Sequence, residues 1–182
     1  MISSKPVHFK AGRAAAICLA LLFTPSLATA QQSGQTPCAA DAHRQFDFWV
    51  GTWQVTNAQG NMVGTNRIST ILGGCVLLEE WQSAGPYAGK SFNIYDAAND
   101  KWHQTWVDNG GLLLELDGGL EDGNMVLKGE RPGPEGQQVL HRITWAPLEG
   151  GDVRQTWDTS ADEGQTWTTQ FNGLYSPKEP EE

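Results

Sequence analysis

The sequence is short of basic residues, histidine and cysteine. Twelve lysines and arginines stand against 21 aspartates and glutamates, which gives a net charge of −9. Nucleic acids and anionic membrane surfaces bind to basic patches, so this composition argues against both as partners. The histidines are isolated, without a His-x-His or His-Glu-x-x-His pattern. We therefore expect no metal site and no cofactor.

Three further features are missing: a long apolar run, a sustained helical period and a nucleophile or phosphate motif. No Gly-x-Ser-x-Gly elbow and no phosphate-binding glycine loop occurs. The main apolar run, residues 14–23, is far shorter than the roughly 20 residues of a membrane-spanning helix. It follows Lys5, Lys10 and Arg13 and precedes the small-residue site at 28–30. These features predict a signal peptide over residues 1–30, cleaved after Ala30, and a periplasmic or secreted protein.

Two cysteines, Cys38 and Cys75, remain once residues 1–30 are removed. An even pair in an oxidising compartment predicts a disulfide. A catalytic thiol is the alternative, but neither cysteine lies in a local signature for one. The remaining chain has nine basic and 21 acidic residues, a net charge of −12, and is long enough for one domain with a real core.

Short alternating runs with turn residues between them predict an all-β fold. About ten strands are expected: residues 53–56, 67–72, 75–82, 91–95, 102–107, 112–116, 125–128, 139–145, 153–157 and 167–175. Their spacing is typical of a sandwich or barrel. We expect a polar leader at 31–45 that reaches a short helical turn at 39–48, a single domain at 46–176 and a disordered tail at 177–182.

Several motifs carry a resemblance to a known family. FDFWVGTW at 46–53 contains the Gly-x-Trp of lipocalin-like barrels, and GCVLLEEW at 74–81, GKSFNIYD at 89–96 and WHQTWVD at 102–108 follow it. With SADEGQTW at 160–167, these stretches resemble a family of exported bacterial proteins of unknown function. The resemblance implies a single closed antiparallel, calycin-like barrel with a cavity. It implies no reaction and no catalytic residue.

SADEGQTW also resembles the Asp-box of sialidase-type propellers. A propeller needs several blades of about 40–45 residues each, and this chain is too short and has only one such motif. We interpret the stretch as a hairpin turn in which Asp162 accepts backbone hydrogen bonds, Gly164 supplies a positive φ and Trp167 begins the next strand.

Several strands combine tryptophan with Glu, Gln or Asp on one face. A cavity with aromatic walls and a few fixed polar groups is typical of a small-molecule site. The candidate ligand-binding residues are Glu79, Trp81, Tyr95, Gln104, Trp106, Asp108, Arg142 and Arg154. Ordinary filling of the barrel is the alternative for the tryptophans, and a solvated outer face is the alternative for the arginines. His141 shares a face with Ile143 and Trp145 and is the one candidate for haem, although a structural role is favoured.

Three functions are compatible with these patterns. The first is an exported protein that binds a small, partly apolar or aromatic ligand. The second is a cofactor-free isomerase, cyclase or hydrolase, with Glu79 or Asp108 as general acid or base and Arg142 or Arg154 stabilising negative charge. The third is a structural or partner-binding envelope module. We favour the first, and nothing in the sequence indicates the oligomeric state.

Overall fold

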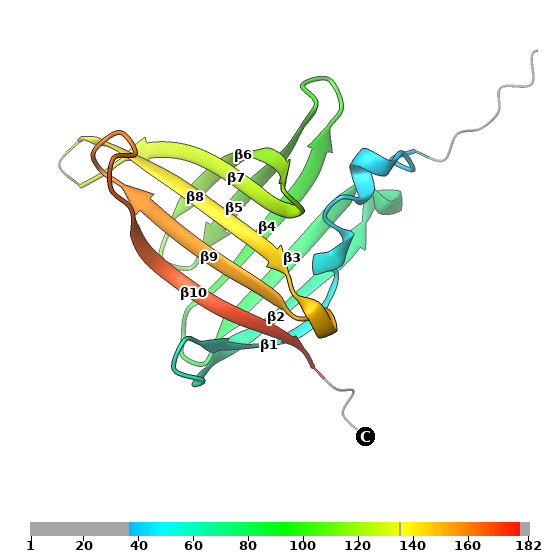
Figure 1. The fold of residues 1–182 in the computed structure, drawn as a ribbon, viewed down its shortest axis with the longest axis horizontal. Coiled ribbons are helices and arrows are strands. Elements are labelled where there is room, and N and C mark those ends of the chain that lie inside the picture. The colour runs from blue at the N-terminus through cyan, green and yellow to red at the C-terminus, as the bar shows by residue number, and fades with distance from the viewer. Residues whose placement is uncertain (1–36, 135, 179–182) are drawn as a thin grey trace, which may run out of the picture. The chain divides into compact units, whose positions relative to one another are not determined.

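The chain forms ten antiparallel strands that close into one barrel (Figure 1). The computed structural model describes residues 37–134 and 136–178. The strands are β1 Gly51–Asn57, β2 Met62–Ile71, β3 Val76–Ser83, β4 Ala88–Asp96, β5 Lys101–Asp108, β6 Leu113–Glu121, β7 Asn124–Pro132, β8 Gln138–Pro147, β9 Val153–Ser160 and β10 Thr168–Pro177. Each strand pairs with its neighbours in sequence, and β1 also pairs with β10, so that Trp53 lies opposite Pro177. The all-β, ten-stranded barrel predicted from the sequence is confirmed.

Four short 3-10 turns complete the described chain: η1 Asp41–Arg44, η2 Asp47–Trp49, η3 Leu72–Gly74 and η4 Glu149–Gly151. The short helical turn predicted near residues 39–48 is present as η1 and η2. The proposed signal peptide at 1–30 lies outside the described residues. Within residues 37–134 and 136–178 no helix combines the length and apolar character needed to cross a membrane.

Several strands are longer than their sequence pattern predicted. β2 begins at Met62 rather than at residue 67, because Gly64 pairs with Val55 of β1 and with Ser83 of β3. β7 continues to Pro132 rather than ending at 128, because it pairs with β8 along its whole length. Hydrogen bonding to neighbouring strands extends a strand beyond its alternating apolar core.

One end of the barrel, here called the closed end, is filled by aromatic side chains. The η2 turn brings Phe46 and Trp49 inside, where both are 0% exposed. Their rings stack with centroids 4.9 Å apart, and Trp145 packs against both. The indole N–H of Trp53 donates to the Trp49 carbonyl at 2.9 Å, and Trp102 packs edge-on against Phe46. This segment therefore acts as a plug in the barrel.

A disulfide joins Cys38 to Cys75 with 5.1 Å between the Cα atoms, as predicted. The Arg44 guanidinium donates to the Gly74 carbonyl beside it and lies 3.4 Å from the Asp47 carboxylate. The bridge closes a loop with a sequence separation of 37 and contributes about 3–4 kcal/mol through the entropy of the unfolded chain. It holds the segment that carries η1 and η2 to the start of β3.

The turn from Ser160 to Thr166 joins β9 to β10 as a hairpin, as predicted. The Asp162 carboxylate accepts from the Thr166 backbone N–H at 2.9 Å and from its hydroxyl at 2.6 Å. These hydrogen bonds, with that from Ser160, lower the pKa of Asp162 to about 2. Gly164 has a φ of +86°, and its carbonyl accepts from the Trp167 indole.

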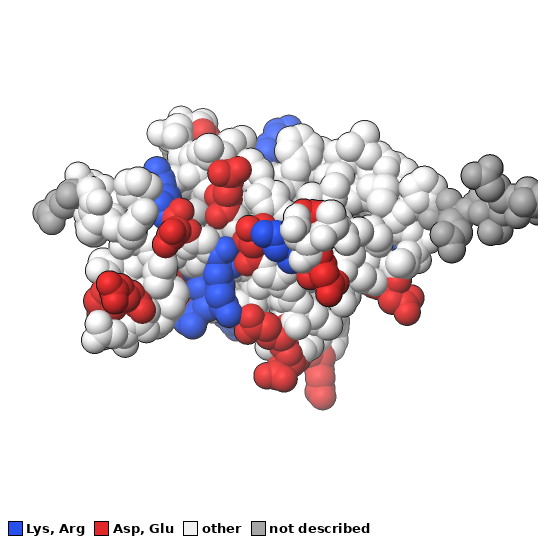
Figure 2. All heavy atoms as spheres, turned by 90° about the horizontal axis from the view of Figure 1, so that it is seen from above, with Lys and Arg blue, Asp and Glu red and all other residues white. Residues whose placement is uncertain are grey.

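Charged side chains on the outer face form pairs of opposite sign. Lys128 lies 2.8 Å from Glu121, and Lys90 lies 2.6 Å from Glu80. Figure 2 shows one face on which most basic side chains lie beside acidic ones. Exposed pairs of this kind each contribute little to stability, but they neutralise the few basic groups locally.

Candidate ligand-binding site

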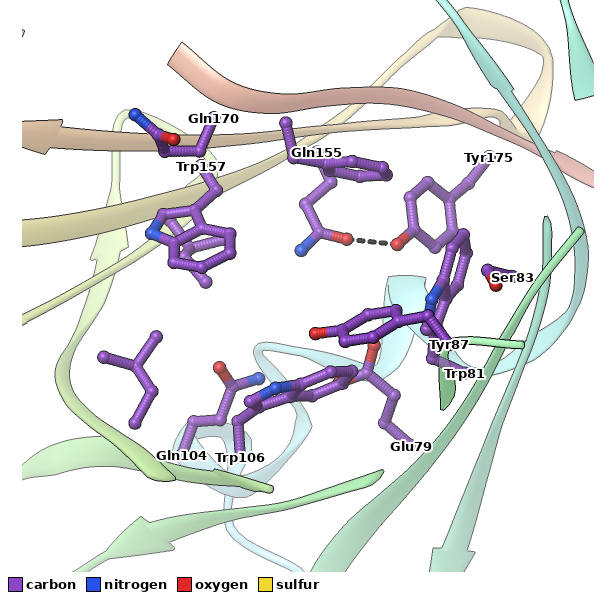
Figure 3. A pocket seen from close by; sticks show the side chains of 13 residues that line it. Glu79, Trp81, Ser83, Tyr87, Gln104, Trp106, Gln155, Trp157, Gln170 and Tyr175 are labelled. Carbon is purple, nitrogen blue, oxygen red and sulfur yellow. Dashed lines mark hydrogen bonds between the residues drawn. The ribbon is translucent and has the colours of Figure 1, made fainter. Parts of the chain in front are cut away.

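A cavity of about 310 Å³ occupies the half of the barrel opposite the plug. Side chains from six strands and from the β3–β4 connection line it (Figure 3). Its aromatic lining residues are Trp81, Tyr87, Trp106, Trp157, Phe171 and Tyr175, its polar ones are Glu79, Ser83, Gln104, Gln155 and Gln170, and its aliphatic ones are Leu114 and Ile143. The barrel is thus filled at one end and hollow at the other.

Inward-facing glycines make room for the indole rings of the cavity wall. A Cβ atom on Gly89 of β4 would lie 2.2 Å from Trp106, and one on Gly64 of β2 would lie 2.6 Å from Trp81. Both distances are far below van der Waals contact, so a larger residue would push the ring away from the wall. The Trp81 ring meets Phe171 edge-on, with 6.0 Å between centroids.

Glu79 of β3 lies at the inner end of the cavity and is only 3% exposed. Its Oε1 accepts from the Asn66 amide at 2.7 Å, and its Oε2 accepts from the Ser91 hydroxyl at 2.6 Å. Burial raises the pKa of Glu79 to about 7, because these two hydrogen bonds only partly offset the loss of hydration. The Glu79 carboxyl group therefore changes between its protonated and ionised forms near neutral pH.

A polar layer lies between the plug and the cavity, formed by Asn66, Glu79, Ser91, Asn93 and Gln104. The Asn93 amide donates to the Ser91 hydroxyl at 2.9 Å, and the Gln104 amide donates to Asn93 Oδ1 at 2.8 Å. These bonds use the nitrogen of Gln104 and leave its side-chain oxygen facing the cavity (Figure 3). The layer holds the Glu79 carboxyl group in one orientation.

The opposite wall presents a second fixed amide. The Tyr175 hydroxyl donates to Gln155 Oε1, which leaves the Gln155 nitrogen directed into the cavity (Figure 3). Burial raises the pKa of Tyr175 well above its ordinary value, and the Glu79 carboxylate adds to the effect. Tyr175 is therefore a neutral hydroxyl donor at any physiological pH.

Asp108 organises the mouth of the cavity at the end of β5. Its Oδ2 accepts from the Tyr87 hydroxyl at 2.7 Å and from the Trp106 indole at 3.3 Å. Its Oδ1 accepts from the Gly110 and Leu112 backbone N–H groups. Partial burial acts to raise the pKa of Asp108, but these hydrogen bonds outweigh it and the pKa is lowered. Burial and Asp108 raise the pKa of Tyr87 to about 12, so Asp108 is the charged partner and Tyr87 the neutral one.

Four of the eight candidate residues line the cavity together: Glu79, Trp81, Gln104 and Trp106. Asp108 lies at the mouth and holds two of the lining side chains. Tyr95 lies elsewhere, towards the end of β4. Its hydroxyl donates to Asp100, and its ring meets His43 edge-on.

The two arginines lie on the outer face of the barrel. Arg142 Nη2 lies 3.1 Å from the Asp158 carboxylate, and its guanidinium covers the Trp167 ring at 4.2 Å. Arg154 donates to the Asn172 side chain at 3.0 Å. Neither arginine lines the cavity as the ligand-binding hypothesis required, because alternation along β8 and β9 buries their neighbours instead.

Several lining residues were not among the candidates. Gln155, Trp157, Phe171 and Tyr175 share faces that the alternation had already marked as mixed aromatic and polar, so the same reasoning reaches them. Tyr87 lies in the connection before β4, where no periodic pattern indicates the direction of a side chain.

His141 faces the interior beside Trp157. The Trp157 indole donates to His141 Nδ1 at 3.1 Å, and the two rings stack. Burial, with the positive charge of Arg131, lowers the pKa of His141. In the described part of the chain, no group of three or more His, Cys, Asp or Glu side chains gathers as a metal site would require.

Comparison with known proteins adds no assignment to this geometry. The sequence matches no protein-family model, and no curated protein matches it.

Proposed function

We propose that this protein binds a small, partly aromatic molecule in the barrel cavity. The observation that carries the proposal is the cavity of about 310 Å³ with six aromatic side chains around it. This volume lies at the lower end of the range for small-molecule sites, roughly 300–1,000 Å³. It suits a ligand with one or two rings.

Fixed polar groups on opposite walls support a ligand-binding role for the cavity rather than an empty space without a function. The Gln104 oxygen and the Gln155 nitrogen each face the cavity, because hydrogen bonds to Asn93 and Tyr175 occupy the other atom of each amide. An acceptor and a donor held in this way orient a ligand at little entropic cost.

Uptake of N-phenyl-1-naphthylamine, a neutral fluorescent probe, tests this function. We expect its emission to rise on binding the wild-type protein and to stay low with Ser83→Trp, which places a ring at the cavity wall. Val107→Trp is the matched control, because Val107 is exposed and lies outside the cavity lining. Equal uptake by the wild type and Ser83→Trp, or none by the wild type, would contradict the proposal.

We further propose that the protein belongs to the exported, lipocalin-like bacterial family that its motifs resemble. The basic and apolar pattern of residues 1–30 and the Cys38–Cys75 disulfide support export to an oxidising compartment. The intact mass of the protein isolated from its native cell tests the proposed export and cleavage. Cleavage after Ala30 is expected, and a full-length cytoplasmic protein would contradict it.

A second candidate function is proton transfer by Glu79. The carboxyl group has its pKa raised to about 7 and adjoins a largely apolar cavity, which are the properties of a general acid or base. Arg142 and Arg154 bond to partners on the outer face. The Tyr175 hydroxyl already donates to Gln155 Oε1, so the Gln155 side-chain nitrogen is the donor that this pair presents to the cavity. An enzyme of this kind would exchange a C–H proton of a bound ligand with D₂O, as NMR would show. Glu79→Gln would stop the exchange while leaving uptake of the neutral N-phenyl-1-naphthylamine intact.

A further inference from the structure

Glu79 is a buried carboxyl group that has no cationic partner among residues 37–134 and 136–178. Both of its hydrogen-bond donors, Asn66 and Ser91, are neutral. None of the residues that line the cavity is a lysine, arginine or histidine. A carboxylate in this position is poorly stabilised by the protein alone.

The next residue in the chain shows the contrast. Glu80 points outwards, lies 2.6 Å from Lys90 and 3.7 Å from Arg67, and its pKa is lowered, chiefly by Lys90. Asp117 and Asp158 on the outer face likewise pair with Lys101 and Arg142. These outer acidic groups have a basic partner, whereas the one in the cavity does not.

Aromatic rings surround the approach to Glu79. Trp81, Tyr87 and Trp106 lie around its carboxyl group in the close view of the cavity (Figure 3). The face of an aromatic ring carries a negative quadrupole and attracts cations, most strongly where water is excluded. The ionised Asp108 carboxylate at the mouth adds negative charge on the path into the cavity.

We propose that the cavity takes an organic cation, an amine attached to an aromatic or apolar group, whose ammonium lies against Glu79 among Trp81, Tyr87 and Trp106. The proposal rests on the proposed binding function and specifies the ligand class. The apolar part of the ligand lies against Trp157 and Phe171 on the far wall. A carboxylate ligand would meet Glu79 with no basic residue to offset it.

Binding of a cation is linked to the protonation of Glu79. The cation favours the carboxylate, so a Glu79 that is protonated in the free protein releases its proton when the amine binds. The other titratable lining groups, Tyr87 and Tyr175, both have raised pKa values and stay neutral. With a pKa of about 7 for Glu79, the ionised fraction, and with it the affinity for an amine, rises about tenfold from pH 6 to pH 8.

Three probes of matched shape and different charge test the proposal: 2-phenylethylamine, 2-phenylethanol and phenylacetate. Isothermal titration calorimetry at pH 8 is expected to show the amine binding at least tenfold more tightly than the alcohol, and phenylacetate most weakly. The amine's advantage is expected to shrink about tenfold at pH 6. Titrations in buffers of different ionisation enthalpy are expected to show proton release near pH 7.

Glu79→Gln is the decisive variant and Glu80→Gln its control. The first is expected to lose most of the preference for the amine over the alcohol, and the second to keep it. The inference is overturned if the amine binds no more tightly than the alcohol, if phenylacetate binds most tightly, if no probe binds, or if Glu79→Gln keeps the preference. In each case, uptake of N-phenyl-1-naphthylamine that Ser83→Trp blocks would leave the binding function standing, and its absence would remove both.

Discussion

Both halves of the barrel contain buried aromatic side chains, but these fill one half and line a cavity in the other. At the closed end, Trp49 and Trp145 pack against each other and against Phe46 with no exposed surface. At the other end, Trp81 and Trp106 stand against the wall and leave space between them and the far strands. The difference lies in the η2 segment, which fills one half and does not reach the other.

The comparison shows that tryptophan inside a barrel does not by itself indicate a binding site. The polar layer marks the boundary, because its buried amide, hydroxyl and carboxyl groups need partners that an aliphatic core cannot supply. On the plug side of this layer the aromatic residues stabilise the fold, and on the other side they line the cavity. Five predictions test this division.

Removing an aromatic ring from the plug has the largest expected effect. Trp49→Ala deletes a fully buried ring that stacks on Phe46 and should lower the free energy of unfolding by about 3–5 kcal/mol. Trp106→Ala, its counterpart at the cavity, should cost less than half as much, because part of that ring faces empty space. Urea denaturation followed by far-UV circular dichroism measures both, and equal losses would contradict the division.

Loss of the disulfide comes next. The double variant Cys38→Ser with Cys75→Ser should lower the free energy of unfolding by about 3–4 kcal/mol, because the unfolded chain regains the freedom of a loop with a sequence separation of 37. Affinity for N-phenyl-1-naphthylamine should stay within twofold at a temperature where the variant is folded. A fall in affinity as large as the fall in stability would show that the two halves are not independent.

The raised pKa of Glu79 should be visible in the pH dependence of the free energy of unfolding. Its pKa in the folded protein is about 7, above the ordinary 4.5, so its protonated form is favoured on folding. Its contribution is fully present below pH 4.5 and is lost as the pH rises through 7. Relative to Glu79→Gln, the wild type should lose on the order of 2–3 kcal/mol between pH 5 and pH 8.

His141 acts in the opposite direction, because its pKa is lowered and its folded form gains stability as the pH rises. Both proteins contain it, so the difference between their urea denaturation curves isolates Glu79. Parallel curves for the two proteins across this range would show that Glu79 is not perturbed.

Crowding the cavity wall should weaken binding at a moderate cost in stability. Gly89→Ala places a Cβ atom 2.2 Å from Trp106, so the ring must move into the cavity. We expect about 1–3 kcal/mol of destabilisation and a loss of probe affinity of roughly tenfold, about 1.4 kcal/mol. Gly119→Ala is the matched control, because a Cβ there meets nothing within 4 Å. Similar effects of the two changes on affinity would contradict the role given to Gly89.

The smallest effect is expected on the outer face. Arg142→Gln and Arg154→Gln should each change probe affinity by less than twofold, since both side chains bond to outward partners. Stability should fall by less than about 1 kcal/mol for Arg142→Gln, as for other partly exposed ion pairs. A large loss of affinity in the titration would place the ligand outside the cavity.

The sequence predicted the barrel because alternation and turn chemistry are local properties. The same alternation brought Glu79, Trp81, Gln104 and Trp106 to one interior. Applied strictly, the same alternation also excludes Arg142 from the cavity lining, since the face of β8 that carries Trp145 is the buried one.

Two features depend on contacts between segments far apart in the chain. The η2 plug arises from an irregular segment whose path no period describes, so the sequence did not reveal that one half is filled. Tyr87 points into the cavity because its hydroxyl reaches Asp108, a contact made 21 residues along the chain. The direction of a side chain in such a loop cannot be predicted until the positions of the neighbouring strands are known.

The pairing of β1 with β10 has a consequence for the order of folding. These two strands are the first and the last, and Trp53 lies opposite Pro177, so the ring of strands cannot close before almost the whole chain is available. Contacts at such sequence separation form slowly, and until they form, β1 and β10 are open edges that can pair with other chains. Without residues 168–178 the open edges would be β1 and β9. Removal of residues 168–178 would therefore yield a protein that aggregates rather than a smaller barrel.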